Sequence, residues 1–310
     1  MGSPLRRAQG GAAGDVLLRR PFAHALRGRR PQSRGTVADG QYEEGDLLVG
    51  ADGLQSTVRA QLLPDLAPRY AGYVGWRGVA EDDGALDPLA FDHMLVGFPP
   101  GELALAIPAP PAAARGSPRR CHFTWFRPAA AAGALPRLMT DASGRQHAIS
   151  IPPPLIRPEL IDAMKADAAR LLAPQIAGVV TRTARPLLQP IVDLESPRLA
   201  FGRAILLGDA AFVARPHVGT GVTKAALDAQ GLADALQAHG DDIDAALAHY
   251  DAERHAFGAA LVARGRYLGG WIEAQSDAAS EPAEAWRDRR AEDFIRAFGS
   301  AGVASPSLSG

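Results

Sequence analysis

Short apolar runs bounded by Gly, Pro and Asp recur along the chain and predict a protein rich in strands. Asp39-Gly40 marks a tight turn, because this pair tolerates positive φ between two extended segments. Residues 108–118, rich in Pro and Ala, predict a loop, and the three prolines at 152–154 predict a rigid connector. Strands are predicted at residues 36–38, 47–49, 72–80, 91–97, 103–107, 121–126, 184–192 and 204–207.

Apolar residues at helical spacing predict four helices. The first covers residues 55–63 and stops before Pro64, and the second begins at Pro158, a residue that suits a first helical turn. A third helix follows Gly221, and a long amphipathic helix follows Gly240. The spacing of the last three rests on Leu160, Ile161, Met164, Ala168, Leu171 and Leu172; on Lys224, Ala225, Ala226, Leu227, Ala229, Leu232, Ala233 and Leu236; and on Ile243, Ala246, Leu247, Tyr250, Phe257 and Leu261.

Residues 204–221 hold the most informative motif, which predicts a flavin-binding strand, turn and helix. The strand delivers the Asp209 carboxylate to its carboxyl end, where it can accept a hydrogen bond from a sugar-like hydroxyl; an Asp there also commonly caps a turn. Gly219 and Gly221 let the backbone approach a planar ring closely, although both also suit an ordinary turn. The partly positive N-terminus of the next helix suits the anion of a reduced flavin.

Two segments together resemble the FAD-dependent aromatic hydroxylases, which are flavoprotein monooxygenases like para-hydroxybenzoate hydroxylase. Residues 208–221 are similar to the family's second flavin motif. Residues 46–59, DLLVGADGLQSTVR, are similar to its middle motif, a strand that ends in Asp-Gly and turns into a helix carrying Ser and Arg. Residues 70–79, YAGYVGWRGV, and the triplet 215–217, Arg-Pro-His, most resemble the 2,6-dihydroxypyridine 3-monooxygenase branch. The resemblance covers about residues 36–270.

The resemblance implies NAD(P)H- and oxygen-dependent hydroxylation of an electron-rich aromatic or hydroxypyridine-type ring, with FAD as cofactor and NADPH or NADH as electron donor. His217 is a candidate base, because a neutral imidazole can take a proton from a phenol-like hydroxyl; it can equally be a packing residue. Arg215 is a candidate for attracting an anionic substrate or balancing the flavin charge, and it can equally be a solvated arginine. The residues expected at the cofactor are Asp52, Gly53, Arg59, Gly208, Asp209, Pro216, Gly219, Thr220 and Gly221.

Other residues of the motifs have a structural alternative. Asp52 can cap the helix that follows it, and Arg59 can hydrogen-bond back to the same turn. The aromatic residues Trp76, Trp125 and Phe126, with His122, lie on predicted strands, where such residues usually form core; one or two of the four are expected to line the substrate pocket.

The chain departs from the family at its start. Such hydroxylases begin with a Gly-x-Gly-x-x-Gly turn that seats the FAD pyrophosphate on a helix N-terminus. Residues 10–14, GGAAG, do not fit this pattern and follow no apolar strand. We therefore expect the first βαβ unit to be absent and the 310-residue chain to hold FAD weakly. A catalytically inactive remnant that binds flavin or an aromatic ligand weakly is the alternative to an active enzyme.

The expected fold class is α/β, with an FAD-binding mixed sheet, its helices and an inserted, mostly antiparallel substrate sheet. Strand 184–192 is expected to return to the flavin sheet. The expected segments are a basic, disordered leader at 1–35, an FAD-domain segment at 36–70, the substrate sheet at 71–182, a second FAD-domain segment at 183–240, C-terminal helices at 241–298 and a disordered tail at 299–310.

Composition and charge exclude several classes of protein. Residues 1–35 hold eight arginines and one acidic residue, and a transit peptide or nucleic-acid arm are the alternatives to a disordered or mis-started leader there. The remainder is mildly acidic and predicts no nucleic-acid groove. Cys121 is the only cysteine, which excludes an intrachain disulfide and fits a cytoplasmic protein. Apolar runs are too short for a membrane span. No spacing predicts a metal site, and a homodimer remains open as the assembly.

Overall fold

A computed structural model describes residues 25–29, 32–36, 42–110 and 117–273 of the chain. The chain passes several times between two units of structure. The first unit combines residues up to 68 with 194–213 and 220–262, and the second combines 69–193, 214–219 and the residues from 263 onward. The predicted turn at Asp39-Gly40 and the predicted tail at 299–310 lie outside the described residues.

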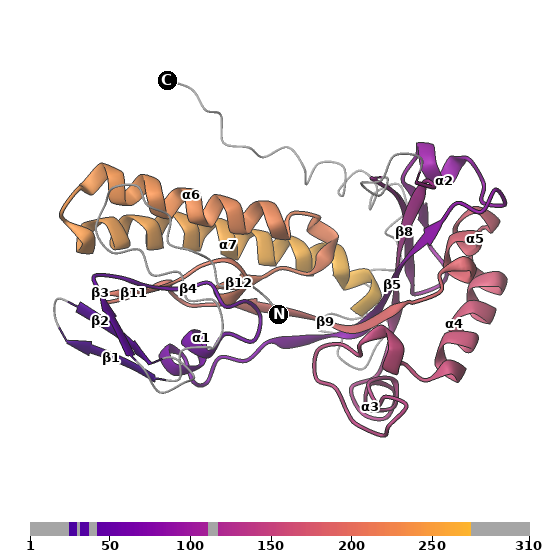
Figure 1. The fold of residues 1–310 in the computed structure, drawn as a ribbon, viewed down its shortest axis with the longest axis horizontal. Coiled ribbons are helices and arrows are strands. Elements are labelled where there is room, and N and C mark those ends of the chain that lie inside the picture. Colours follow the sequence, from indigo (N-terminus) through magenta and orange to yellow (C-terminus); the bar gives the residue numbers. More distant parts are fainter. Residues whose placement is uncertain (1–24, 30–31, 37–41, 111–116, 274–310) are drawn as a thin grey trace. The chain divides into compact units, whose positions relative to one another are not determined.

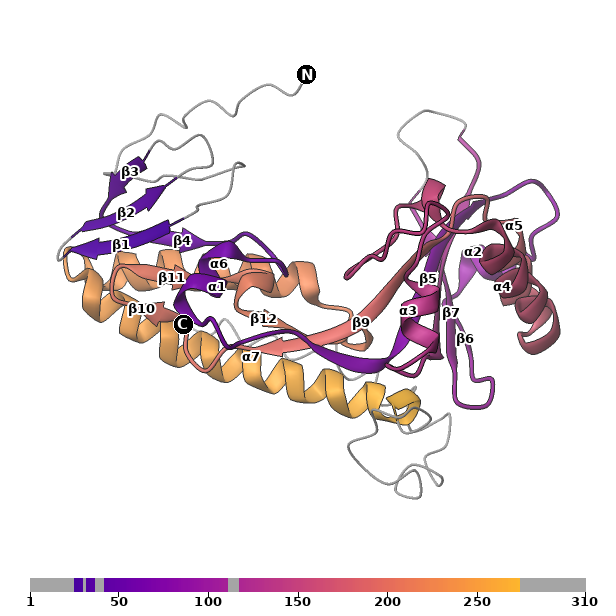
Figure 2. The same ribbon diagram turned by 90° about the horizontal axis from the view of Figure 1, so that it is seen from below.

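The first unit contains a three-stranded mixed sheet in the order β10-β11-β4. Strand β4 (Leu48–Gly50) runs parallel to β11 (Ala204–Leu206), which pairs antiparallel with β10 (Ala200–Phe201). A second, antiparallel sheet has the order β1-β2-β3 (Figure 2). Its strands are β1 (Ala25–Arg29), β2 (Gln32–Thr36) and β3 (Tyr42–Gly45). The expected disordered leader, 1–35, therefore differs from the structure over the described part of that segment, which pairs as strands.

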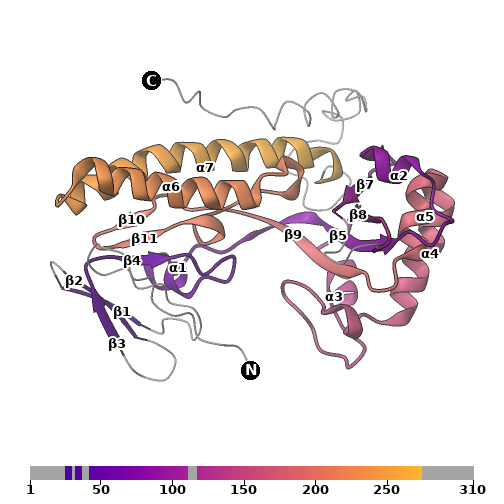
Figure 3. The ribbon, with the colours of Figure 1, turned by 45° about the horizontal axis from the view of Figure 1, so that its top comes forward.

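Three helices accompany these sheets. Helix α1 (Thr57–Leu62) follows β4, and α6 (Gly221–His239) follows the motif after β11. Helix α7 (Ile243–Glu273) begins in the first unit, where it runs beside α6 (Figure 3). Gly240, with a φ of +56°, ends α6 in a conformation that favours glycine. The Tyr250 hydroxyl of α7 donates a hydrogen bond to the carbonyl of Leu206, 3.2 Å away, and so ties α7 to the mixed sheet.

The second unit is built on antiparallel strands in the order β9-β5-β8-β7-β6. These strands are β9 (Leu187–Glu195), β5 (Arg69–Glu81), β8 (Arg120–Pro128), β7 (Leu103–Ala109) and β6 (Leu95–Gly97). The last two residues of β9, Leu194 and Glu195, pair in the first unit with β12 (Phe212–Val213). Strand β9 thus joins the large sheet through 187–193, and the expectation that it returns to the flavin sheet is wrong. Apolar alternation predicts a strand but does not specify its partner.

Helices cover one face of this sheet. Helix α4 (Pro158–Leu171) and α5 (Pro174–Arg182) each begin with a proline and lie beside β5 and β8 (Figure 1). The apolar core between them includes Trp76 and Trp125 from the strands, with Met164 and Ile176 from the helices. Two short helices, α2 (Leu89–Asp92) and α3 (Ala134–Leu138), and the 3-10 turn η1 (Pro153–Leu155) complete the unit's connections.

The opposite face of the sheet carries a second apolar cluster. Tyr73 of β5, Phe126 of β8 and Leu103 of β7 lie in it with Ile191 of β9 and Ile272 of α7. The pairing of β5 with β9 shifts register between Tyr70 and Val74, where Gly72 has a φ of +84°. Tyr73 lies at this irregularity within β5, and its side chain belongs to the site described below.

The predicted mixed α/β class with an antiparallel inserted sheet is confirmed by these elements, and the four predicted helices correspond to α1, α4, α6 and α7. Phe91, predicted in a strand, lies in α2, because the short apolar run 89–91 fits either element. Helix α5 was not predicted, since its nine residues give few helical repeats. Among the described residues, no helix combines the length and hydrophobicity needed to cross a bilayer.

Candidate functional site

The first group of candidate residues lies at one edge of the mixed sheet in the first unit. Because β4 and β11 are parallel neighbours, with Gly50 opposite Leu206, the segments that follow them emerge at the same edge. Asp52 follows β4, and Asp209 lies in the 3-10 turn η2 (Gly208–Ala210) directly after β11. The Asp209 side chain is exposed at this edge, and partial desolvation of its carboxyl group raises its pKa. The segments that follow the two motif strands thus lie at the same edge of the sheet.

Asp52 and Arg59 hold the edge together by hydrogen bonds. The Asp52 Oδ2 atom accepts from the backbone N–H groups of Thr57 and Val58, at 2.7 and 3.2 Å, and so caps α1. Arg59, which is buried, donates to the carbonyls of Ala210, at 3.0 Å, and Leu54. The structural alternative for both residues is therefore present in the structure. The other carboxylate oxygen of Asp52, Oδ1, is buried and accepts no hydrogen bond from any described residue.

A buried ionic network supports the turn at Gly208. This glycine has a φ of +62°; its N–H donates to Asp228 Oδ2 at 3.0 Å, and its carbonyl accepts from Lys224 Nζ at 2.8 Å. Lys224 is also 2.9 Å from Asp228, and Arg254 of α7 donates to the other oxygen of Asp228 at 3.0 and 3.1 Å. The motif reasoning missed this network. The available clue was Lys224 with Asp228 four residues later, on one face of a mainly apolar helix.

The glycines of the motif leave room for a ligand. Gly221 opens α6, and a side chain placed there would meet no atom within 4 Å. The same holds for Gly219, which has a φ of +65°, and for Gly53, which has a φ of +78°. Between the first two, the Thr220 hydroxyl is buried and makes no hydrogen bond within the described part of the chain. The backbone here is thus open to a close approach by a flat molecule.

These features fit the FAD that the motifs imply. Asp209 offers an exposed carboxylate for a hydroxyl donor, and Asp52 and Thr220 each hold a buried oxygen with unused hydrogen-bonding capacity. The start of α6 adds N–H groups and a partial positive charge for an electron-rich ring edge. The first unit therefore contains residues suited to polyhydroxyl and ring contacts of a flavin.

The second group of candidate residues lies in the second unit, on the 3-10 turn η3 (Pro216–Val218) and the residue before it. Arg215 is fully buried, and its Nε donates to Asp193 Oδ2 at 2.8 Å. Arg266 of α7 donates to the other oxygen of Asp193 at 2.8 and 3.0 Å. Arg215 is therefore held by a fully buried carboxylate near the end of β9, and this ion pair anchors the first residue of the Arg-Pro-His triplet.

His217 is buried against the sheet. Its Nε2 atom lies 2.7 Å from the Tyr73 hydroxyl, and its ring meets that of Phe126 edge-on with centroids 4.5 Å apart. Burial, with the neighbouring charges of Arg215 and Arg77, lowers the pKa of His217 to about 3. The imidazole is consequently neutral near pH 7 and is a weak base, able to accept a hydrogen bond. Gly269 of α7 permits this packing, because an added Cβ would collide with the Tyr73 hydroxyl.

The aromatic candidates separate onto the two faces of the sheet. Trp76 and Trp125 lie in the core beneath the helices. Phe126 faces His217, and His122 lies exposed on the same face as Phe126, lining a hollow with Arg77. Strand register alone assigns these faces, but only relative to one residue whose face is known. Tyr73 and Arg77 were missed for that reason.

Comparison with known proteins identifies the families that this chain resembles. Residues 70–193 match the family described as FAD binding domain-like, and residues 192–265 match the FAD binding domain family. The chain is 32% identical over 207 residues to 2,6-dihydroxypyridine 3-monooxygenase of Paenarthrobacter nicotinovorans, which is 66% of this chain and 51% of that protein. It is 32% identical over 227 residues to the FAD-dependent urate hydroxylase of Klebsiella pneumoniae, 70% of this chain and 49% of that protein. The chain spans about half the length of these curated relatives.

Solved structures give the same result. The structure of 2,6-dihydroxypyridine-3-hydroxylase from Arthrobacter nicotinovorans matches with a TM-score of 0.75 and 25% identity, covering 84% of this chain and 67% of that one. A Klebsiella pneumoniae protein crystallised with FAD and uric acid matches with a TM-score of 0.67 and 25% identity, covering 92% and 67%. With its two flavin motifs at one sheet edge, its FAD-binding segments and these relatives, the chain belongs to the FAD-dependent aromatic hydroxylases.

Proposed function

We propose that this protein is an FAD-dependent monooxygenase that hydroxylates an electron-rich aromatic or heteroaromatic ring, with NAD(P)H as electron donor and O2 as oxidant. The observation that carries the proposal is the meeting of Asp52 and Asp209 at the carboxyl ends of two parallel neighbouring strands. Bound FAD supplies the electron transfer and oxygen activation. The protein's residues hold the cofactor and orient the substrate.

The first unit provides the cofactor contacts in this proposal. Asp209 accepts a hydrogen bond from a hydroxyl of the FAD sugar chain, because its carboxylate is exposed directly after β11. Asp52 and Arg59 keep the edge in shape through the α1 cap and the carbonyl contacts. At the start of α6, Thr220 and Gly221 let the backbone come close to the flavin ring.

The second unit provides the substrate chemistry in this proposal. His217 is neutral and accepts a hydrogen bond from the substrate hydroxyl; its lowered pKa makes it a weak base, so it orients the hydroxyl rather than taking its proton outright. Tyr73 fixes the imidazole through the 2.7 Å hydrogen bond at Nε2. Arg215, held by Asp193, sets the position of the turn rather than touching the substrate. The Pro216 carbonyl accepts the Gly219 N–H at 3.0 Å and has a second lone pair for a substrate hydroxyl.

The cofactor assignment is tested by titrating FAD into Asp209→Ala and following flavin fluorescence. A hydrogen bond to a charged group contributes about 1.5–3 kcal/mol, so the variant should bind FAD roughly 10- to 100-fold more weakly than the parent. Asp241→Ala, which removes another exposed carboxylate of the first unit, is the matched control and should bind FAD as the parent does. Equal FAD affinity in all three proteins would contradict the assignment.

A further inference from the structure

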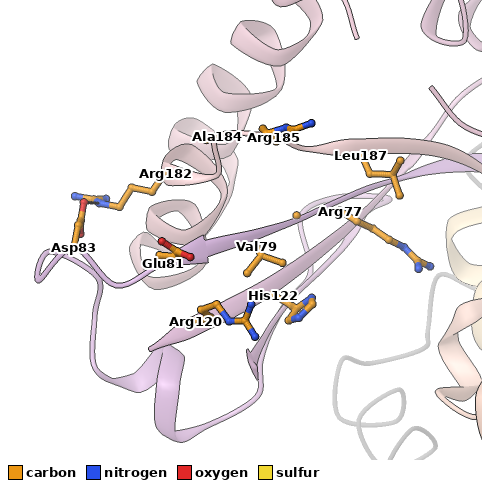
Figure 4. Close-up of a pocket in the computed structure, with 11 residues that line it drawn as sticks. Arg77, Val79, Glu81, Asp83, Arg120, His122, Arg182, Ala184, Arg185 and Leu187 are labelled. Atoms are coloured by element: carbon orange, nitrogen blue, oxygen red, sulfur yellow. Dashed lines mark hydrogen bonds and ion pairs between the residues drawn. The ribbon is translucent and has the colours of Figure 1, made fainter. Parts of the chain in front are cut away.

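Figure 4 shows a hollow of the second unit, whose volume is about 700 Å³. It lies on the face of the large sheet that also carries Tyr73 and Phe126. It is formed entirely within the second unit, by strands β5 and β8 and the connection from α5 into β9. We call it the basic hollow. The lining side chains that matter here are Arg77, Glu81, Arg120, His122, Arg182 and Arg185.

Two of its four arginines already have partners. Arg182 donates to Asp83 at 3.1 Å, and Figure 4 shows these two side chains meeting at one end of the hollow. Arg120 donates to the carbonyl of Pro110, at 2.7 and 3.2 Å, and lies opposite Glu81 across the paired strands. The acidic side chains of the lining are therefore located beside these two arginines.

Arg77 is different, because it is partly buried and pairs with no acidic residue in the described part of the chain. Its Nε is buried, and no described residue accepts a hydrogen bond from it. Burial lowers the pKa of its guanidinium. A desolvated cation without an acceptor is costly, and proteins normally place an opposite charge beside it. Among the described residues, Arg77 thus has no counter-charge.

The guanidinium of Arg77 is also close enough to the candidate base, His217, to affect its pKa. Arg77 faces Leu187 and Thr124 across the sheet pairing and lines the hollow, and its charge also contributes to the lowered pKa of His217. An anion bound at Arg77 would therefore lie in the hollow and near the imidazole. A planar guanidinium is well suited to an oxyanion, which it can bind with two parallel hydrogen bonds.

We propose that Arg77 binds a negatively charged oxygen, a carboxylate or an ionised ring hydroxyl, of an aromatic substrate seated in the basic hollow, and so selects anionic rings. This inference rests on the proposed function in treating the bound ring as a substrate. The binding of the anion itself does not depend on flavin or on turnover. Neutralising Arg77 in this way would also weaken its effect on His217, so that substrate binding makes the imidazole a stronger base.

The proposal is tested by calorimetric binding to the full chain with two matched pairs of probes. One pair is 4-hydroxybenzoate and 4-hydroxybenzamide, and the other is 4-nitrophenol, as its phenolate, and 4-nitroanisole. The charged member of at least one pair should bind about 10-fold or more tightly than its neutral partner, the effect of one charge-assisted hydrogen-bonded pair. Arg77→Met should abolish that preference, while Arg77→Lys should retain part of it.

The matched control is Arg170→Met, which removes an arginine of α4 that pairs with Asp167 outside the hollow. It should keep the full preference. If Arg77→Met does not fold, as judged by circular dichroism, Arg77→Lys and the parent still decide the question, because a lysine cannot reproduce the bidentate geometry.

Four results would overturn the proposal: no preference for the charged member of either pair, an unchanged preference in Arg77→Met, inorganic phosphate binding as tightly as the aromatic anions, or displacement of the bound anion by FAD. The third would indicate a site for inorganic anions only, and the fourth a site for the cofactor's phosphates. Equal FAD affinity of the parent and Asp209→Ala would leave this result intact, so the two proposals fail separately.

Discussion

At the scale of single residues, His217 shows what a sequence motif predicts and what it leaves undecided. The sequence identifies it because it is the only histidine inside a motif, and leaves base and packing residue as equal interpretations. In the structure, it is both buried and hydrogen-bonded to Tyr73. Its neighbours Tyr73, Phe126 and Gly269 come from β5, β8 and α7, each more than 50 residues away in the sequence, and no local pattern predicts such contacts.

The burial of His217 predicts a pH dependence of stability. Its pKa is about 3 in the folded protein and about 6.5 when unfolded, so between these values the unfolded chain binds more protons. The free energy of unfolding should therefore fall as the pH drops below about 6.5, and the contribution of His217 to that loss should reach roughly 2 kcal/mol at pH 5. Urea unfolding of the parent and His217→Gln at pH 7.5, 6 and 5 measures it.

The difference in stability between parent and His217→Gln should shift by that amount in favour of the variant as the pH falls. Tyr73→Phe is the matched control, because it removes the hydrogen bond but leaves the imidazole buried. It should lower stability by about 1 kcal/mol at pH 7.5 and keep the acid-side slope. A difference between parent and His217→Gln that stays constant from pH 7.5 to 5 would show that the imidazole is not desolvated.

At the scale of elements, α6 illustrates what periodicity predicts and what it misses. The helix lies where the apolar spacing places it, yet its buried residues are Lys224, Asp228, Leu232 and Ala235, while Leu227 is exposed. A pattern of apolar residues assumes that the inward face is apolar. Here the inward face of the first two turns carries Lys224 and Asp228, which hydrogen-bond to the Gly208 turn. Arg254 of α7 pairs with Asp228, and this contact cannot be read from the sequence of α6.

This network predicts a large effect for Asp228→Ala. The substitution leaves Lys224 and Arg254 buried without their acceptor and removes the partner of the Gly208 N–H, so the free energy of unfolding should fall by about 3–5 kcal/mol. Asp234→Ala, on the same helix but exposed, should change it by no more than about 0.5 kcal/mol. Urea denaturation gives both values, and Asp228→Asn should fall between them. Equal effects at 228 and 234 would rule out a structural role for the network.

At the scale of the whole molecule, the sequence predicts the class of fold and the order of its segments better than their pairing. The mixed sheet, the antiparallel sheet and four helices follow from apolar patterns and turn residues. The partner of β9, the short helix α2 and the second proline-initiated helix do not, because each depends on contacts distant in sequence or on runs too short to decide. The motif residues Asp52 and Asp209 were predicted, whereas Arg77 and the Gly208 network needed the structure.

The central claim is that this chain uses FAD to place an oxygen atom from O2 on an aromatic ring. The most direct measurement supplies FAD, NAD(P)H and ¹⁸O2 with the aromatic anions that bind the protein, and follows ring hydroxylation by mass spectrometry. The account predicts a product that carries one ¹⁸O atom in a new ring hydroxyl, with one NAD(P)H oxidised per product formed. Oxidation of NAD(P)H that yields only hydrogen peroxide with every bound anion, or a product without ¹⁸O, would contradict it.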